Sequence, residues 1–200
     1  MKRVFGVVGM LLVLSIGLAA VVQAADDYKK FGVGVKADYV KANESTNFTA
    51  AQLKVGDDVV PGIDLEYFFM KNLSAQLFAA VTRHDIKLNN AFAGSTWLLP
   101  PSVTVKYHPL AGDLISPYVG FGFNVVFPFS SKVNGVPDFS IDNSVGWTAQ
   151  AGADIKIKDN IYFNIDYKYL NVDTKAMIGG TKYDLGLNPH LFAIGVGYRF

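Results

Sequence analysis

Residues 145–157 have the sequence VGWTAQAGADIKI, and this stretch decides the fold. Apolar residues occupy every second position, from Val145 and Trp147 to Ile157, and mostly polar or small residues occupy the positions between them. Successive side chains of a strand point to opposite faces, so a period of two predicts a β-strand with one apolar and one polar face.

The same alternation recurs along the rest of the chain. Eight strands are enough to close a small barrel, and consecutive strands joined directly pair antiparallel. The sequence therefore predicts an all-β fold, an eight-stranded antiparallel barrel. The seven further runs are 31–39, 62–69, 73–82, 102–108, 118–125, 161–169 and 191–200.

The connections between the runs alternate in length. Short turns and long loops in strict alternation place all turns at one end and all long loops at the other, which is the layout of an outer-membrane barrel. Short periplasmic turns are expected at 70–72, 109–115 and 158–160, and long, mostly polar extracellular loops at 41–61, 83–101, 128–144 and 173–189.

A soluble sandwich or lipocalin-like barrel also alternates, with its apolar face turned inward. Two features favour the transmembrane barrel. The polar face carries charges of both signs, as a narrow polar lumen requires, and aromatic residues gather near strand ends on the apolar face, as in an interfacial girdle. These aromatic residues are Tyr39, Tyr67, Phe69, Tyr107, Tyr167, Tyr169 and Tyr198.

Composition narrows the class of protein. The 200 residues suit a single domain, and the absence of cysteine excludes disulfides and thiol chemistry. A net charge of +1 disfavours a nucleic-acid partner, because a phosphate-binding patch would show in the sum.

The N-terminal segment has the pattern of a secretory signal peptide. Lys2 and Arg3 precede an apolar run over 4–22, and the small residue Ala24 precedes polar residues. A transmembrane helix is the alternative, but no basic cluster follows the run. We expect residues 1–24 to be cleaved and residues 25–200 to form the barrel.

The charged residues on the polar faces are expected to pair across the lumen. Asp64 and Glu66 lie two apart on one face, and basic residues on other strands can neutralise them, which favours salt bridges over acid–base catalysis. The predicted network comprises Lys36, Asp38, Asp64, Glu66, Lys106, Asp154, Lys156, Asp166 and Arg199.

No arrangement of residues points to catalysis or to a cofactor. His84, His108 and His190 fall at different ends of the predicted barrel, so a three-histidine metal site is not expected. We expect a protein that is not an enzyme and that holds no metal or cofactor.

Several blocks of sequence resemble one family. The C-terminal strand ends at Tyr198 and Phe200 and resembles the signal by which the outer-membrane assembly machinery recognises its clients. The other blocks, taken in order, resemble the OmpW family of Gram-negative outer-membrane proteins. They are Leu99-Pro100-Pro101 before VKYH at 105–108, PYVGFGFN at 117–124, Gly146-Trp147 with QAG at 150–152, NVDT at 171–174, and Asn188-Pro189.

The resemblance implies a monomeric barrel surrounded by outer-membrane lipid and lipopolysaccharide. Members of the family, including alkane-uptake proteins, are thought to pass small hydrophobic molecules from the loops to a lateral opening. The family commonly has a proline in the third strand, but residues 79–84 here contain none. Phe78 matches the inward apolar residue of that strand, and Lys168 stands where its bulky apolar counterpart is usual. A lysine there could pair with Asp166 or Asp154 and close the path.

Large apolar residues in the expected long loops are further candidates for the solute path. An exposed apolar cluster marks a binding surface, although the same residues could simply fold the loops onto the barrel rim. A barrel that does not transport and acts as a structural or receptor protein through its loops is the alternative function. The loop candidates are Phe48, Leu53, Phe92, Trp97, Leu98 and Leu99.

Overall fold

The computed structural model describes most of the chain beyond its N-terminal segment. The expected signal peptide, residues 1–24, lies outside the described residues. Among the residues described, no helix has the length and apolar character needed to cross a membrane. The described residues are 28–41, 43, 45–46, 53–55, 57–88, 91–133, 140–178 and 180–200.

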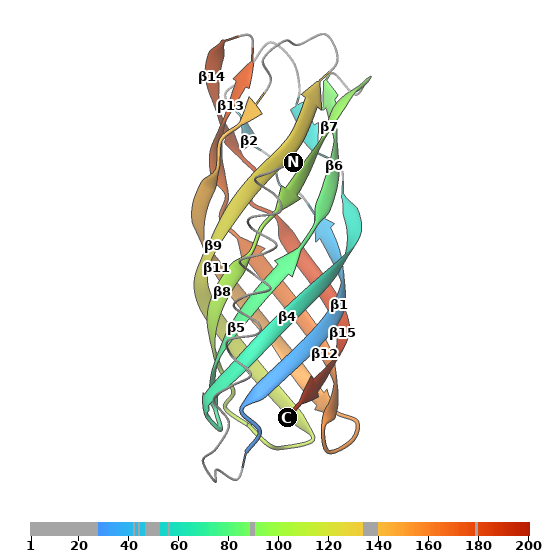
Figure 1. The fold of residues 1–200 in the computed structure, drawn as a ribbon, viewed down its shortest axis with the longest axis vertical. Helices are drawn as coiled ribbons and strands as arrows, with labels where there is room; N and C mark the ends of the chain where they lie inside the picture. The colour runs from blue at the N-terminus through green and yellow to red at the C-terminus, as the bar shows by residue number, and fades with distance from the viewer. Residues whose placement is uncertain are drawn as a thin grey trace.

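Eight strands form a closed antiparallel barrel, as the alternation predicts (Figure 1). Each strand pairs with its neighbour along the ring, and β9 pairs with β11 to complete the circle. In ring order the strands are β1 (Phe31–Lys41), β4 (Asp58–Met70), β5 (Leu73–Ala80), β8 (Ser102–Tyr107), β9 (Ile115–Val133), β11 (Ser144–Lys156), β12 (Ile161–Leu170) and β15 (His190–Arg199).

The first and last strands lie side by side. Gly34 of β1 lies opposite Gly197 of β15, and the backbones of Phe31 and Phe200 exchange hydrogen bonds of 3.0 and 2.8 Å. A closed ring leaves no sheet edge open to pair with other chains, which a membrane-spanning sheet requires.

Burial alternates along each barrel strand and assigns the two faces. On β9 and β11, Phe121 and Val145 point outward with 64% and 72% of their surface exposed, while Thr148 is fully buried. The apolar faces therefore form the outer surface of the barrel and the polar faces line its lumen. A soluble barrel would have the opposite arrangement, so the burial pattern agrees with the transmembrane prediction.

The two ends of the barrel differ (Figure 1). Residues 71–72, 108–114 and 157–160 make short connections at the end that also carries the C-terminus, and we call it the turn end. The opposite end, the loop end, carries further strands. They are β2 (Ser45–Thr46), β3 (Leu53–Val55), β6 (Thr82–Leu88), β7 (Ala91–Leu99), β10 (Ser140–Ile141), β13 (Asp173–Ile178) and β14 (Thr181–Gly186).

These additional strands correct the expectation that the long connections are loops. β7, β6 and β3 pair in that order beside the upper part of β9, and β10, β13, β14 and β2 form a separate small sheet. A strand outside the membrane has no lipid-facing side, so its residues need not alternate even though its backbone pairs. Alternation alone therefore missed them.

Candidate functional site

Inward-pointing side chains fill the lumen of the barrel in two layers of opposite chemistry. The polar layer occupies the turn-end half. The apolar layer lies at the loop-end tips of the strands, where the small polar side chains of Ser102, Asn124, Ser144 and Thr148 are buried beside it. The polar layer comprises Lys36, Asp64, Glu66, Ser74, Gln76, Lys106, His108, Ser116, Tyr118, Gln150, Asp154, Asn164, Asp166 and Arg199. The apolar layer comprises Val40, Val60, Phe78, Ala80, Val126, Leu170, Val172, Ala176, Leu185, Leu187 and Leu191.

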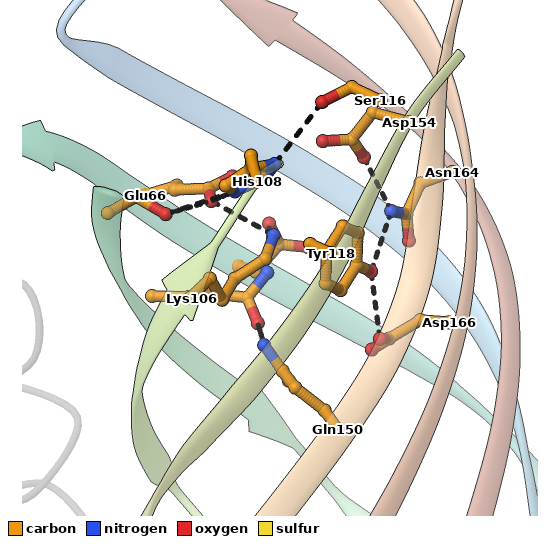
Figure 2. A network of polar contacts seen from close by, with 12 residues as sticks. Glu66, Lys106, His108, Ser116, Tyr118, Gln150, Asp154, Asn164 and Asp166 are labelled. Atoms are coloured by element: carbon orange, nitrogen blue, oxygen red, sulfur yellow. Dashed lines mark hydrogen bonds and ion pairs between the residues drawn. The ribbon is translucent and has the colours of Figure 1, made fainter. Parts of the chain in front are cut away.

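Glu66 is one centre of the polar layer (Figure 2). Its Oε1 accepts a hydrogen bond of 2.6 Å from Ser74 and lies 2.9 Å from the ammonium of Lys106. His108 Nε2 lies 3.3 Å from the same oxygen, and the other ring nitrogen is 3.4 Å from Ser116. All of these residues are almost fully buried, so the carboxylate is stabilised by the protein in place of water.

A second group surrounds Asp166. Lys36 lies 3.3 Å from Asp64 and 3.5 Å from Asp166, so one ammonium joins two carboxylates. The hydroxyl of Tyr118 donates to Asp166 at 2.8 Å and accepts from Asn164 at 3.0 Å. These contacts connect strands on different sides of the barrel (Figure 2).

The polar layer closes the lumen. Gln150 donates to Gln76, which donates to Asp64, and Asn164 and Arg199 both bind Asp154. The gap that Lys36, Gln76 and Asn164 line, among others, has no room for a water molecule. Below them, a cleft of about 230 Å³ opens at the turn end, so the plug lies above a periplasmic-side vestibule.

One member of the predicted charge network does not belong to it. Lys156 is half exposed and lies 3.7 Å from Asp159, because β11 has left the lumen when it reaches the turn. Asp38 is buried beside the layer. Four basic–acidic contacts in the lumen involve the others: Lys36 with Asp64 and Asp166, Lys106 with Glu66, and Arg199 with Asp154.

Lys168 lies at the boundary between the two layers. Its ammonium is 3.9 Å from the centre of the Phe78 ring, and both side chains are 1% exposed. No contact of 4 Å or less joins Lys168 to Asp166 or Asp154, the carboxylates with which it was expected to pair, and these instead contact Lys36 and Arg199. Lys168 instead packs against the floor of the apolar layer.

The barrel wall is interrupted beside Phe78. Pairing of β5 with β4 ends at Gly62 and Ala80, and pairing of β5 with β8 ends at Phe78 and Ser102. Val81 belongs to no strand, and the chain resumes as β6, which pairs with β7. The wall therefore has no ladder beyond Phe78 on the β8 side and none beyond Ala80 on the β4 side.

Two prolines explain this interruption. The backbone N–H of Phe68 on β4 donates to the carbonyl of Lys30 on the β1 side. Backbone N–H groups alternate between the two neighbouring strands, so the nitrogen of Pro61 faces the other neighbour, toward Val81. The carbonyl of Pro101 accepts a hydrogen bond from Val125 on the β9 side. The nitrogen of the preceding residue, Pro100, therefore faces the other side, toward Ala80. Proline has no backbone N–H. Val81 therefore faces a missing donor on the β4 side, and Ala80 faces one on the β8 side.

Comparison with known proteins places the chain in a family. A model described as "OmpW family" matches residues 18–200. The chain belongs to the OmpW family. Outer membrane protein W of Vibrio cholerae is 31% identical over 170 residues, which cover 76% of this chain and 78% of that protein.

Solved structures share the OmpW-family fold. The crystal structure of OprG from Pseudomonas aeruginosa has a TM-score of 0.80 at 22% identity, over 86% of this chain and 96% of that one. The solid-state NMR structure of AlkL in lipid bilayers has a TM-score of 0.70 at 18% identity, over 90% and 94% of the two chains. The OmpW-family barrel described here is thus a protein of the Gram-negative outer membrane.

This OmpW-family chain lacks the strand proline that the resemblance led us to seek in residues 79–84. The ladder nonetheless stops at β5, because Pro61 of β4 and Pro100, in the connection between β7 and β8, lie on either side of it. In the sequence Pro100 stands out only as part of a family motif, and its role follows from the register of the neighbouring ladders.

The remaining candidates for the solute path lie at the loop end. Phe48 lies outside the described residues. The others lie in strands and not in the expected loops, because β6 and β7 form a hairpin above the wall interruption and β3 pairs with β6. These are Leu53 in β3 and Phe92, Trp97, Leu98 and Leu99 in β7.

Sequence reasoning missed the uncharged half of the polar layer. Its hydrogen bonds involve Gln76, Gln150, Tyr118 and Asn164. Each lies on the inward face of its strand, as do the buried charged residues of the predicted network. Parity combined with hydrogen-bonding capacity would have identified them. Within the described ranges, no three His, Cys, Asp or Glu side chains are grouped so as to hold a metal ion.

The predicted assembly signal lies on the outer surface at the turn end. Tyr198 and Phe200 are 45% and 57% exposed and their rings stack at 6.2 Å. Phe200 also stacks on Phe31 of the first strand. Their role in recognition by the assembly machinery stays a prediction.

Proposed function

We propose that this protein admits small hydrophobic molecules through the outer leaflet of the outer membrane and releases them sideways into the bilayer. Lipopolysaccharide forms a polar barrier to such molecules, and a short apolar path past it is sufficient. The solute would enter among the loop-end strands, cross the apolar layer, and leave at residues 79–81.

The observation that carries the proposal is the division of the lumen into two layers. An apolar solute that reaches the polar layer would have to displace buried ion pairs, at a cost of several kcal/mol, about 3–5 for one broken pair. Apolar side chains can instead exchange contacts with one another for contacts with the solute. The layers thus favour a path that enters the loop end and turns aside before the turn end.

The interruption of the wall supplies the exit. Val81 is 44% exposed on the outer surface, and Ala80, which precedes it, belongs to the apolar layer. The two prolines beside them remove ladder hydrogen bonds that an opening would otherwise have to break. Separation of the strands at this point therefore costs less than elsewhere in the ring.

A reversible cross-link tests the exit. The chain has no cysteine, so the variant Ala79→Cys/Pro101→Cys carries one engineered pair. Continuation of the β5–β8 register places these two residues opposite each other on the outward face. We expect oxidation to lower uptake of the apolar probe N-phenyl-1-naphthylamine by cells at least fivefold, and reduction to restore it.

The pair Ala75→Cys/Val105→Cys is the matched control. These residues lie opposite each other on the same two strands and the same outward face, where the ladder is intact. Oxidation of this control should leave uptake unchanged. Equal uptake by both oxidised variants and their reduced forms would overturn the lateral exit.

The wild-type protein distinguishes transport from the alternative function. A structural or receptor barrel, plugged through its whole length, would give cells no more uptake than an empty vector at equal protein levels. That result would overturn the transport proposal itself. The heat-dependent gel shift of a folded barrel shows that each variant has assembled.

A further inference from the structure

Lys168 has no hydrogen-bond partner among the residues that the structure describes. Its ammonium is buried against the face of the Phe78 ring, and none of the described side chains accepts a hydrogen bond from it. A cation over an aromatic ring is stabilised, but the ring leaves the three N–H donors of the ammonium unsatisfied. An unsatisfied charge in a lumen of this kind calls for a further partner.

An acceptor in the same position is left unsatisfied too. Asp38 Oδ2 is buried and accepts no hydrogen bond in the part of the chain that the structure describes. This oxygen and atom Cε2 of Phe78 both lie within 3 Å of the point where a β-carbon on Gly62 would stand. Asp38 Oδ2 therefore lies no more than about 5 Å from the edge of the Phe78 ring whose face Lys168 covers.

The two groups do not satisfy each other. No ion pair of 4 Å or less joins Lys168 and Asp38, although every other lumenal lysine or arginine named above contacts a carboxylate. Lys168 and Asp38 therefore remain as a charged donor and a charged acceptor at this boundary, beside the buried hydroxyl of Ser102, which lies opposite Phe78 in the ladder and also lacks a hydrogen-bond partner among the described residues. A group that donates to Asp38 and accepts from Lys168 would satisfy both.

From this arrangement we propose that the boundary at Phe78 is a binding site for small amphipathic molecules that carry one hydroxyl group on an apolar body, such as alkanols and phenols. The inference rests on the proposed function and names the substrate class of the same path. The hydroxyl oxygen accepts from Lys168, its proton is donated to Asp38, and the apolar body replaces contacts among Phe78, Leu170 and Leu191.

A hydroxyl fits this site better than the simpler alternatives. A pure hydrocarbon would leave both charged groups unsatisfied, which costs free energy when they are buried. A carboxylate would satisfy Lys168 but would place a second negative charge beside Asp38. A neutral hydroxyl provides one acceptor and one donor, and it carries no charge into the apolar layer.

The test compares two probes that differ by one hydroxyl group. p-Cresol and toluene are titrated into the full barrel in lipid nanodiscs, and their affinities are read from the methyl NMR signals of Leu170 and Leu191, corrected for partition into lipid. We expect wild type to bind p-cresol at least tenfold more tightly, as one hydrogen bond to a charged group provides.

The variant Lys168→Met removes the donor and keeps an unbranched apolar chain. It should lose about tenfold in affinity for p-cresol and bind toluene at least as well as wild type. Lys158→Met, at an exposed turn-end position, is the control and should keep the wild-type preference.

The outcomes separate this inference from the proposed function. Equal wild-type affinity for the two probes would overturn the hydroxyl site and leave transport of hydrophobic molecules standing, because both probes would still occupy the apolar layer. Failure of both probes to shift the methyl signals would overturn the site and count against the path. An unchanged preference in Lys168→Met would exclude Lys168 as the donor.

Discussion

The turn-end and loop-end halves of the lumen are equally buried but are stabilised in different ways. Lys106 and Phe78 are each 1% exposed, and Leu170 is fully buried. In the polar layer each group depends on a particular partner, since a lone buried charge is costly. In the apolar layer the stability depends on filled volume and hardly on which residue fills it. Only the second kind of packing can yield to a solute.

Removal of one partner in the polar layer should have the largest effect on stability. Lys106→Met leaves Glu66 buried with only its contacts to Ser74 and His108. We expect the free energy of unfolding, measured by urea titration in lipid vesicles, to fall by about 3–5 kcal/mol.

The double variant Glu66→Gln/Lys106→Met is its control. It removes both charges and keeps the volume, so its loss should be clearly smaller than that of Lys106→Met alone. Equal losses in the two proteins would show that packing of the lysine chain, and not its charge, stabilises this half of the lumen.

Truncation in the apolar layer should cost somewhat less and should also change function. Leu170→Ala leaves a cavity, and we expect a loss of about 3 kcal/mol in the same titration. Because the cavity lies on the proposed path, uptake of N-phenyl-1-naphthylamine should rise by at least twofold.

Leu77→Ala is the matched control for this substitution. Leu77 lies on the outer face of β5, where lipid can fill the space that the side chain leaves. We expect little loss of stability and no gain in uptake. A rise in uptake with both variants would indicate general leakage of the membrane around the barrel.

The barrel itself could be predicted from the sequence because a period of two is a local property. Each strand needs only its own residues to reveal that Thr148 points inward and Trp147 outward. The same rule failed for Lys156, which has inward parity but lies where β11 leaves the lumen. Parity gives the face, and only the three-dimensional position along the barrel gives the surroundings.

The interruption of the wall could not be predicted from one strand. Residues 79–84 contain no proline, and the break at Val81 results from Pro61 on β4 and from Pro100, which precedes β8. The direction in which each missing N–H points depends on the register of both ladders. The division of the lumen into layers likewise depends on which residues of the eight strands lie at the same height in the barrel. No single strand's sequence reveals that.

The smallest effect on stability is expected at an exposed ion pair that has the same separation as a buried one. Lys182 lies 2.9 Å from Asp142 at the loop end, the same distance as Lys106 from Glu66, but its side chain is 55% exposed. Water already stabilises both charges there and salt screens them, so Lys182→Ala should cost less than about 1 kcal/mol, and less again at high salt. The urea titration that serves for Lys106→Met measures the loss at low and at high salt.

A loss close to that of Lys106→Met would mean that the distance between the charges alone sets the strength of these pairs. The expected gap would show that burial gives the polar layer its dependence on each partner.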